Sequence, residues 1–392
     1  MQPTQVTRRD VLRAGAAAAL AAGAAPKLAE LPDVLTAAVI GHTGRGDYGH
    51  GLDVAFNGVP GLRVVAVADP DDAGRAKAAQ RIGAPRQYAD YRQMLEKEKP
   101  SLVSVAPRWS EHHHAMVMAA LSSGAHVIME KPITLTLAEA DDIVSFAEKN
   151  GKKVAVAHQM RLSPSVVGLR RAVAGGLIGD LLHVDAWGKQ DSRAGGEDML
   201  VLGSHLFDLV RFFAGDARWC NARVTQVGRD VTAADARTVA EQIGPVAGDE
   251  VVAHFGFDNA VDATFTSRGR LRNAVGHWGI ELVGSGGSAR ILADITPRVF
   301  VMKPAPWTDG GRTEQWLPFQ EGGATPPGDS ADANRRVVED WLDAIRTDKE
   351  PTCSAGAAMK SLEMIMAVYH SALAQARVSL PLKDRSHPLV KK

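Results

Sequence analysis

The 392-residue sequence lacks the features of several protein classes. It has only two cysteines, Cys220 and Cys353. Two distant cysteines do not make a disulfide framework, so we expect both to be unpaired and largely buried. Lysine plus arginine and aspartate plus glutamate number 45 each, with no basic stripe, which indicates neither a nucleic acid nor a membrane surface as partner. No segment beyond the N-terminus could form a membrane helix, and a small molecule is the expected ligand.

The N-terminus has the pattern of an export signal. Arg8 and Arg9 precede a weakly apolar, alanine-rich segment, residues 14–25. The pattern predicts a twin-arginine signal peptide over residues 1–30, and a basic disordered tail is the alternative. The twin-arginine route carries folded proteins. We therefore expect a periplasmic or otherwise exported protein that could carry a bound cofactor out of the cytoplasm.

Residues 31–157 alternate short apolar runs with helical stretches. Runs without polar alternation are typical of strands buried on both faces. The predicted strands are Leu35–Ile40, Leu62–Ala68, Leu102–Ala106, His126–Met129 and Val154–Ala157, and the predicted helices are Asp71–Ile82, Glu111–Ser123 and Leu137–Asn150. This α/β pattern predicts a Rossmann domain, a doubly wound parallel sheet covered by helices.

The pattern changes in residues 158–392, which we expect to form a second domain. A helix to about Ala174 and a strand over Leu181–Trp187 are followed by a helix from about Met199 to Phe213. Several strands then follow in succession, before two closing helices over Ala333–Arg346 and Ala355–Ala376. The pattern predicts an α+β domain with a largely antiparallel, open sheet.

A glycine-rich turn follows the first strand directly. Gly41, Gly44 and Gly46 allow the backbone to turn tightly and approach a pyrophosphate at the next helix N-terminus. As a G-x-G-x-x-G motif the spacing is imperfect, because Thr43 occupies the second glycine position. A glycine-rich turn that binds no ligand is the alternative. If the turn is a cofactor-binding loop, Arg45 is also expected to contact the cofactor.

The second predicted strand ends in Asp69. A carboxylate there can accept hydrogen bonds from the adenosine ribose and would repel a 2′-phosphate, which favours NAD over NADP. Farther along, Glu130, Lys131 and Pro132 follow another strand, at the sheet edge where open parallel sheets bind ligands. Lys131 can donate a hydrogen bond to a substrate hydroxyl or ketone.

The chain resembles the Gfo/Idh/MocA oxidoreductases in these motifs, in the region of Pro107 and His113, and in the segments HQMRLSP and GSHLFD. The resemblance implies a Rossmann domain joined to a second α/β domain whose open sheet is often used for oligomerisation, so a homo-oligomer is expected. It implies hydride transfer between a nicotinamide and a sugar, cyclitol or related polyol. It also implies Lys131 and His205 as the catalytic lysine and histidine, and places His113 beside the cofactor.

The chemistry of the two side chains agrees with these roles. An imidazole, with an ordinary pKa near 6.5, suits His205 for removing a hydroxyl proton, and Lys131 would stabilise the developing alkoxide. One residue departs from the family pattern. Val201 stands four residues before His205, where the family usually has an aspartate, and this puts ordinary dehydrogenase turnover in doubt.

Other polar residues could substitute for the missing carboxylate or bind substrate. Asp198 is one candidate, although an N-cap role before Met199 is an equal alternative. Asp208 could orient His205 or face solvent, and Arg161 could line the cleft or pair with a carboxylate. The remaining candidates are Gln159, Lys189, Asp191 and Glu197.

Two further patterns are weaker. His112, His113 and His114 are adjacent on a predicted helix and point in different directions, so we expect no common metal site. Trp307 and Trp316 lie in a long polar loop, where they could stack on a sugar, cover a core edge or form an oligomer contact.

Three functions remain open from the sequence. The first is a sugar oxidoreductase with tightly bound NAD, since an exported enzyme has no pool of free NAD. The second is an NAD-dependent glycosidase or lyase, which oxidises a sugar carbon transiently, eliminates, and returns the hydride. The third is a non-catalytic sugar or cofactor sensor.

Overall fold

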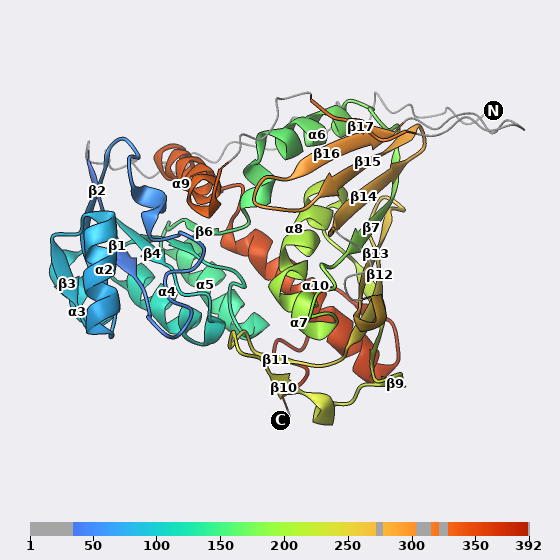
Figure 1. Cartoon of the computed structure of the whole chain (residues 1–392), viewed down its shortest axis with the longest axis horizontal. Helices are drawn as coiled ribbons and strands as arrows, with labels where there is room; N and C mark the ends of the chain where they lie inside the picture. The colour runs from blue at the N-terminus through green and yellow to red at the C-terminus, as the bar shows by residue number, and fades with distance from the viewer. Residues whose placement is uncertain (1–33, 272–276, 303–314, 321–327, 391–392) are drawn as a thin grey trace, which may run out of the picture. The chain divides into compact units, whose positions relative to one another are not determined.

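The computed structural model describes residues 34–271, 277–302, 315–320 and 328–390 (Figure 1). The predicted signal peptide and Trp307 lie outside these residues. Within them, no helix combines the length and the apolar character that crossing a membrane requires.

Six parallel strands form the N-terminal sheet, in the order β3-β2-β1-β4-β5-β6. The strands are β1 (Leu35–Ile40), β2 (Leu62–Ala68), β3 (Arg86–Tyr88), β4 (Leu102–Val105), β5 (His126–Met129) and β6 (Val154–Val156). Successive side chains of β1 enter different cores: Ala38 and Ile40 join one, Ala37 and Val39 the other. Because both faces are buried, the strands are apolar without alternation, and the predicted doubly wound fold is confirmed.

Helices cover both faces of this sheet. One face carries α3 (Tyr91–Glu98), α4 (His113–Ser122) and α5 (Leu137–Lys149). The other face carries α2 (Asp72–Ile82) and a 3₁₀ turn, η1 (Val54–Phe56). Local signals set the helix starts: the Asp71 side chain accepts from the N–H of Gly74, and Thr136 and Glu139 form a capping box. The sequence did not predict β3 or α3, which are short.

A helix near the C-terminus also covers the face of the N-terminal sheet that carries α2. Helix α9 (Ser330–Thr347) buries Val337 and Trp341 in the same core as Ala37 and Val39. The Trp341 indole N–H donates a 3.1 Å hydrogen bond to the carbonyl oxygen of Lys153. Helix α9, which lies within the predicted domain of residues 158–392, therefore also packs on the Rossmann sheet. In Figure 1 this helix lies above β6.

In the described residues the C-terminal sheet has ten strands in a mixed arrangement. Its order is β17-β16-β15-β14-β7-β13-β12-β8-β18, with β9 beside β8, and β7 and β13 are parallel. The longer strands are β7 (Leu181–Trp187), β8 (Trp219–Gln226), β12 (Glu250–Gly256), β13 (Asp262–Arg268), β14 (Gly279–Gly284), β15 (Gly287–Leu292) and β16 (Arg298–Met302). The two-residue strands are β9 (Arg229–Asp230), β17 (Leu317–Pro318) and β18 (Val378–Ser379), and a separate pair is β10 (Arg237–Thr238) with β11 (Pro245–Val246). The expected largely antiparallel sheet is confirmed.

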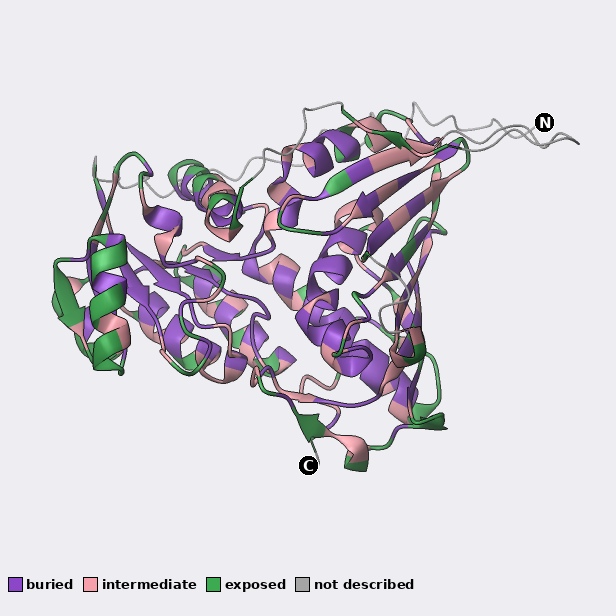
Figure 2. Ribbon diagram, viewed as in Figure 1, coloured by how far each residue is buried: buried purple, intermediate pink, exposed green. Residues whose placement is uncertain are grey.

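Helices pack on one face of this sheet. They are α7 (Gly196–Val201), α8 (Gly203–Ala214) and α10 (Ala355–Ala374); α6 (Pro164–Ala174) lies near β16. Figure 2 shows α10 as the most continuously buried helix. The rings of Phe207 on α8 and Phe265 on β13 lie 4.8 Å apart. Cys220 and Cys353 are buried and unpaired, as predicted.

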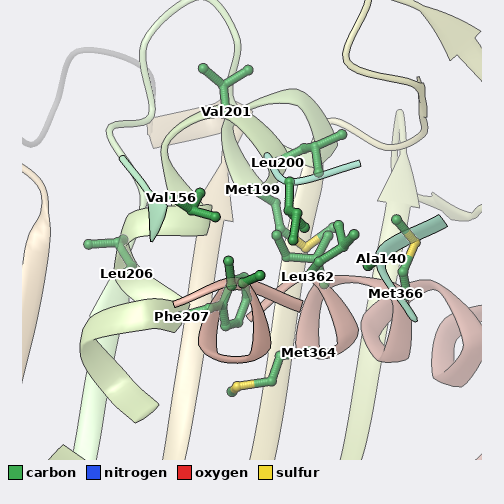
Figure 3. Close-up of a cluster of buried hydrophobic side chains, with 14 of the residues drawn as sticks. Ala140, Val156, Met199, Leu200, Val201, Leu206, Phe207, Leu362, Met364 and Met366 are labelled. Carbon is green, nitrogen blue, oxygen red and sulfur yellow. The ribbon is translucent and has the colours of Figure 1, made fainter. Parts of the chain in front are cut away.

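Four further 3₁₀ turns lie in connections of the described residues. They are η2 (Ser110–His112), η3 (Gln159–Leu162), η4 (Ala233–Asp235) and η5 (Gly269–Leu271). The single helix predicted from Met199 to Phe213 is instead two helices that meet at Leu202. Figure 3 shows the consequence: Phe207 and Met199 lie beside Leu362 of α10, whereas Val201 points away from that helix.

Candidate active site

A cavity of about 300 Å³ brings together residues from both parts of the fold. Lys131 follows β5, Gln159 begins η3, Lys189 follows β7 and His205 lies on α8. Further lining residues that sequence reasoning missed are His50, Arg193, Glu241, Trp278 and Asp294. No local motif marks these five, because they reach the cavity from loops whose course depends on the rest of the fold.

Lys131 reaches into this cavity from the carboxyl end of β5. It is 8% exposed, and its Nζ donates a 2.9 Å hydrogen bond to the backbone carbonyl oxygen of Val201. Burial lowers the pKa of Lys131, against the opposing influence of Glu130 and Glu241. A lysine so placed can donate a hydrogen bond to a substrate oxygen and exchange a proton with it.

Glu130 holds the glycine-rich loop against the end of β5. Its Oε1 accepts from the backbone N–H of His50 at 2.9 Å and lies 3.2 Å from the ring Nδ1 of His50. Burial alone would raise the pKa of Glu130, but the His50 hydrogen bonds and Lys131 lower it to about 2. Gly49 makes this contact possible: its φ is +64°, and a Cβ there would lie 2.6 Å from Oε1. Glu130 thus links the loop to the segment that carries Lys131.

His205 presents a neutral imidazole to the cavity. It is 8% exposed, and its Nδ1 is buried with no hydrogen-bond partner among the described residues, which leaves Nε2 for the cavity. Burial, with Lys131, His158 and His50 adding to it, holds the pKa of His205 well below its usual range. A neutral imidazole can accept a proton, which a general base requires.

Two predicted substrate ligands pair with each other instead. Nε of Arg161 donates a 2.6 Å hydrogen bond to Asp208, and both side chains are buried. Asp208 therefore does not face solvent, and Arg161 has the structural pairing that the sequence left open. Neither residue lines the cavity.

Asp198 also turns away from the cavity. Its carboxylate accepts from the Ser267 hydroxyl at 2.6 Å and from the backbone N–H groups of Lys189 and Gln190 at 3.2 and 3.0 Å. The N-cap alternative is wrong as well, because α7 begins at Gly196. Asp198 instead holds the segment after β7 in place, since only the folded sheet brings Ser267 beside it.

Only some residues of the predicted polar segment after β7 line the cavity. Lys189 lines the cavity, as does Arg193. Asp191 is not part of the lining; it accepts two hydrogen bonds from the Arg193 guanidinium, at 3.1 and 2.6 Å. Hydrogen bonding to Arg193, against burial, lowers the pKa of Asp191 to about 2. Glu197 lies 3.3 Å from the Arg237 guanidinium.

A second cavity, about 430 Å³, lies at the carboxyl ends of β1 and β2. Gly41 and Asp69 line it together with His42, Arg92 and His112. The Asp69 carboxylate accepts from the Thr43 hydroxyl at 2.7 Å, from the Thr43 N–H, and from the N–H of Asp71. Asp69 therefore anchors the glycine-rich loop as well as placing a carboxylate at the cavity.

The loop itself differs from the prediction. No α-helix occurs between β1 and β2 in the described chain; residues 54–56 form only a 3₁₀ turn. Gly44, Gly46, Gly49 and Gly51 all have positive φ, which a right-handed helix cannot include. The helix N-terminus that we expected to bind a pyrophosphate is therefore absent from this described segment. The backbone N–H groups of the glycine-rich loop are the groups left there to bind a pyrophosphate. No atom lies within 4 Å of the Cβ position of Gly44, so its backbone is accessible to a ligand. The Asp69 carboxylate at this cavity suits the hydroxyl groups of a ribose.

The side chain of Arg45, another predicted cofactor residue, lies half exposed and pairs with Glu111 at 2.9 Å. Gly46 fits closely against the neighbouring loop, since a Cβ there would lie 2.5 Å from the N atoms of Arg108 and Trp109. Trp316, for which the sequence left sugar stacking, a core-edge cover and an oligomer contact open, packs against the guanidinium of Arg290, whose carbon lies 4.2 Å from the ring centroid.

His113 connects two loops instead of lining either cavity. It is fully buried, and its ring nitrogens lie 2.8 Å from the carbonyl oxygen of Pro132 and 2.7 Å from that of Pro107. It thus holds the segment after Lys131 beside the segment after β4. Its two neighbours have other partners: His112 stacks on His42, and His114 lies 3.3 Å from Asp142.

Two family models match the chain. Residues 35–158 match the oxidoreductase family's NAD-binding Rossmann fold, and residues 177–380 match its C-terminal alpha/beta domain. The chain belongs to the Gfo/Idh/MocA oxidoreductase family. The family resemblance of the motifs is therefore confirmed, including the presence of a nicotinamide-binding fold.

Among individual relatives, D-apiose dehydrogenase of Paraburkholderia graminis is 27% identical over 348 residues, which cover 86% of this chain and 88% of that protein. A glycosyl hydrolase family 109 protein of Shewanella amazonensis is 28% identical over 173 residues, 41% of this chain and 36% of that protein. Among solved structures, a levoglucosan dehydrogenase in complex with NADH and levoglucosan superposes with a TM-score of 0.72 at 19% identity, covering 89% of this chain and all of that one.

Proposed function

We propose that this protein is an NAD-dependent oxidoreductase that oxidises a hydroxyl group of a sugar or polyol. The observation that carries the proposal is the convergence of Lys131 and His205 on one cavity, from the Rossmann sheet edge and from α8. D-apiose dehydrogenase, similar over most of the chain, supports the sugar substrate. The NAD-binding family model supports the nicotinamide.

The chain's own residues supply the proton chemistry. His205, neutral and facing the cavity through Nε2, accepts the hydroxyl proton of the substrate. Lys131 donates a hydrogen bond to the same oxygen as its negative charge develops, so the charge is stabilised where it forms. NAD, when bound, supplies the acceptor for the hydride that leaves the carbon.

We further propose that the cofactor is NAD, tightly held, and that the protein is exported through Arg8 and Arg9 by the twin-arginine route. A protein folded around its cofactor can carry it out, and the cofactor is then regenerated in place by a second substrate. The test is to purify mature protein without added nucleotide, dialyse it, denature it, and quantify released NAD(H) and NADP(H) by mass. Near-stoichiometric NAD(H) is expected. Empty protein would overturn tight binding.

Turnover is tested separately, by following the absorbance of the reduced cofactor during incubation with sugars and polyols. We expect a keto-sugar product, and its formation should be lost in both Lys131→Ala and His205→Ala. A protein that binds sugars without turnover, or whose phenotype survives both substitutions, would be a sensor instead.

A second function is an NAD-dependent glycosidase or lyase. The family 109 glycosyl hydrolase relatives and the replacement of the family aspartate by Val201 support it. Product analysis separates the two, because a glycoside substrate would be cleaved with no net change in cofactor oxidation state.

A further inference from the structure

Beside His205 lies a second histidine, which begins the segment HQMRLSP. His158 is the second residue after β6, and it is 3% exposed. Its ring meets the His205 ring edge to face, with 5.6 Å between centroids. The two side chains are 47 residues apart in sequence and face each other only because η3 packs against α8.

Each of these rings has one nitrogen without a partner among the described residues. On His158 it is Nε2, and on His205 it is Nδ1. Both atoms are buried, and a buried imidazole nitrogen without a partner costs free energy. The two nitrogens do not bond to each other directly, and a single water molecule between the rings would satisfy both.

The other side of His158 faces a carboxylate. Nδ1 of His158 lies 3.4 Å from Oδ1 of Asp208. Arg161 holds Asp208 in position through its other oxygen, at 2.6 Å. A buried carboxylate at this distance favours a proton on Nδ1 of His158, and this leaves Nε2 with a lone pair.

We propose that His158 is a positioning residue, which accepts a hydrogen bond from Nδ1–H of His205 through one bridging water molecule and so keeps Nε2 of His205 unprotonated toward the cavity. The proposed series of interacting side chains runs from Asp208 through His158 to His205. The arrangement performs for His205 the task that a carboxylate performs for the histidine of a Ser-His-Asp triad, namely fixing the tautomer and the ring orientation. Here Val201 offers no carboxylate, so the orienting group comes from η3 and α8.

This inference rests on the proposed function, in which His205 is the base, but its tautomer can be measured without turnover. Protein labelled with ¹⁵N-histidine reports the protonated nitrogen of each ring, and His205 is assigned by comparison with His205→Asn. We expect wild-type His205 to be protonated at Nδ1 and bare at Nε2. A wild-type His205 protonated at Nε2 would overturn the proposal even in an active enzyme.

Substitution of His158 tests the consequence for catalysis. His158→Phe keeps the ring volume and removes the acceptor; we expect kcat to fall roughly 10- to 100-fold with KM for the sugar and Kd for NAD unchanged. His158→Gln retains an acceptor and should recover most of kcat. The double variant Val201→Asp with His158→Phe should recover part of the lost kcat, because it supplies a carboxylate near Lys131 and His205.

His387 provides the matched control, because it is also buried, at 4% exposure, and does not line the cavity. His387→Phe should lower the melting temperature without changing kcat. If His158→Phe behaves as His387→Phe does, with kcat intact, His158 has only a structural role. If no sugar supports hydride transfer in the wild type, the proposed function fails, while the ¹⁵N spectrum still decides the tautomer.

Discussion

The side-chain amine of Lys131 donates a 2.9 Å hydrogen bond to the backbone carbonyl oxygen of Val201. The Val201 side chain carries no carboxylate, so this position offers Lys131 only a main-chain oxygen. The same carbonyl oxygen also accepts from the Ser204 hydroxyl at 3.2 Å. It therefore keeps a partner when the lysine is removed.

Replacing Lys131 should separate catalysis from folding. Lys131→Met keeps the length of the side chain and removes the donor, so we expect kcat to fall by about 100-fold or more. The melting temperature should stay within a few degrees, since no buried acceptor is left without a partner. Steady-state kinetics and calorimetry measure both. A drop in melting temperature that accounts for the lost activity would contradict a catalytic role.

The buried pair of Arg161 and Asp208 should stabilise the fold without binding substrate. Arg161→Met leaves the Asp208 carboxylate buried without its guanidinium, and we expect a loss of about 3–5 kcal/mol in the free energy of unfolding. Urea unfolding measures this loss. The exposed pair of Arg218 with Asp258 is the control, and Arg218→Met should change little. A raised KM for the sugar with unchanged stability would restore Arg161 as a substrate ligand.

Asp69 should make the protein prefer NAD to NADP. Its carboxylate lines the cavity at the ends of β1 and β2, where a 2′-phosphate would meet a like charge. We expect binding titrations to give NAD the tighter Kd, by about tenfold or more. Asp69→Asn keeps the oxygen that Thr43 uses and should reduce the preference. A preference for NADP that disappears in Arg92→Ala would instead assign the selectivity to Arg92.

Stability should fall as the pH drops below about 6.5. Burial lowers the pKa of His126 and of His387 to about 4, and it also lowers that of His113, His158 and His205. The unfolded chain binds protons at these residues from about pH 6.5 downward, whereas the folded chain does not. Each histidine therefore opposes folding by about 1.4 kcal/mol per pH unit between its two pKa values.

Melting temperatures measured from pH 7.5 to pH 4.5 test this expectation, with His126→Gln as the comparison. That variant should lose less stability on acidification than the wild type. A flat profile between pH 6.5 and pH 5 would show that the buried histidines take up protons in the folded protein.

Export should depend on the arginine pair near the N-terminus. Changing Arg8 and Arg9 together to lysine should retain the protein inside the cytoplasm, because the twin-arginine route reads that pair. Cell fractionation with immunoblotting measures the distribution, and a single substitution at Lys27 serves as the control. Unchanged export of the double variant would refute this signal.

Much of the architecture follows from local sequence. The parallel strands are short apolar runs because both faces are covered, and the helix starts carry their own caps, such as Asp71 and Thr136. Lys131 could be placed at the sheet edge because it lies two residues after a recognisable strand. His205 came from the family motif, since a histidine within an amphipathic helix has no local mark of function.

The tertiary structure alone decided which polar residues meet. Asp198 and Asp208 are both carboxylates near His205 in sequence, yet one bonds to Ser267 and the other to Arg161. It also decided that α9 covers the Rossmann sheet and that the glycine-rich loop continues without a helix. The physical reason is the same in each case: a strand or a cap is specified by neighbours along the chain, whereas the partner of a buried charge or an apolar face is specified by residues that only folding brings close.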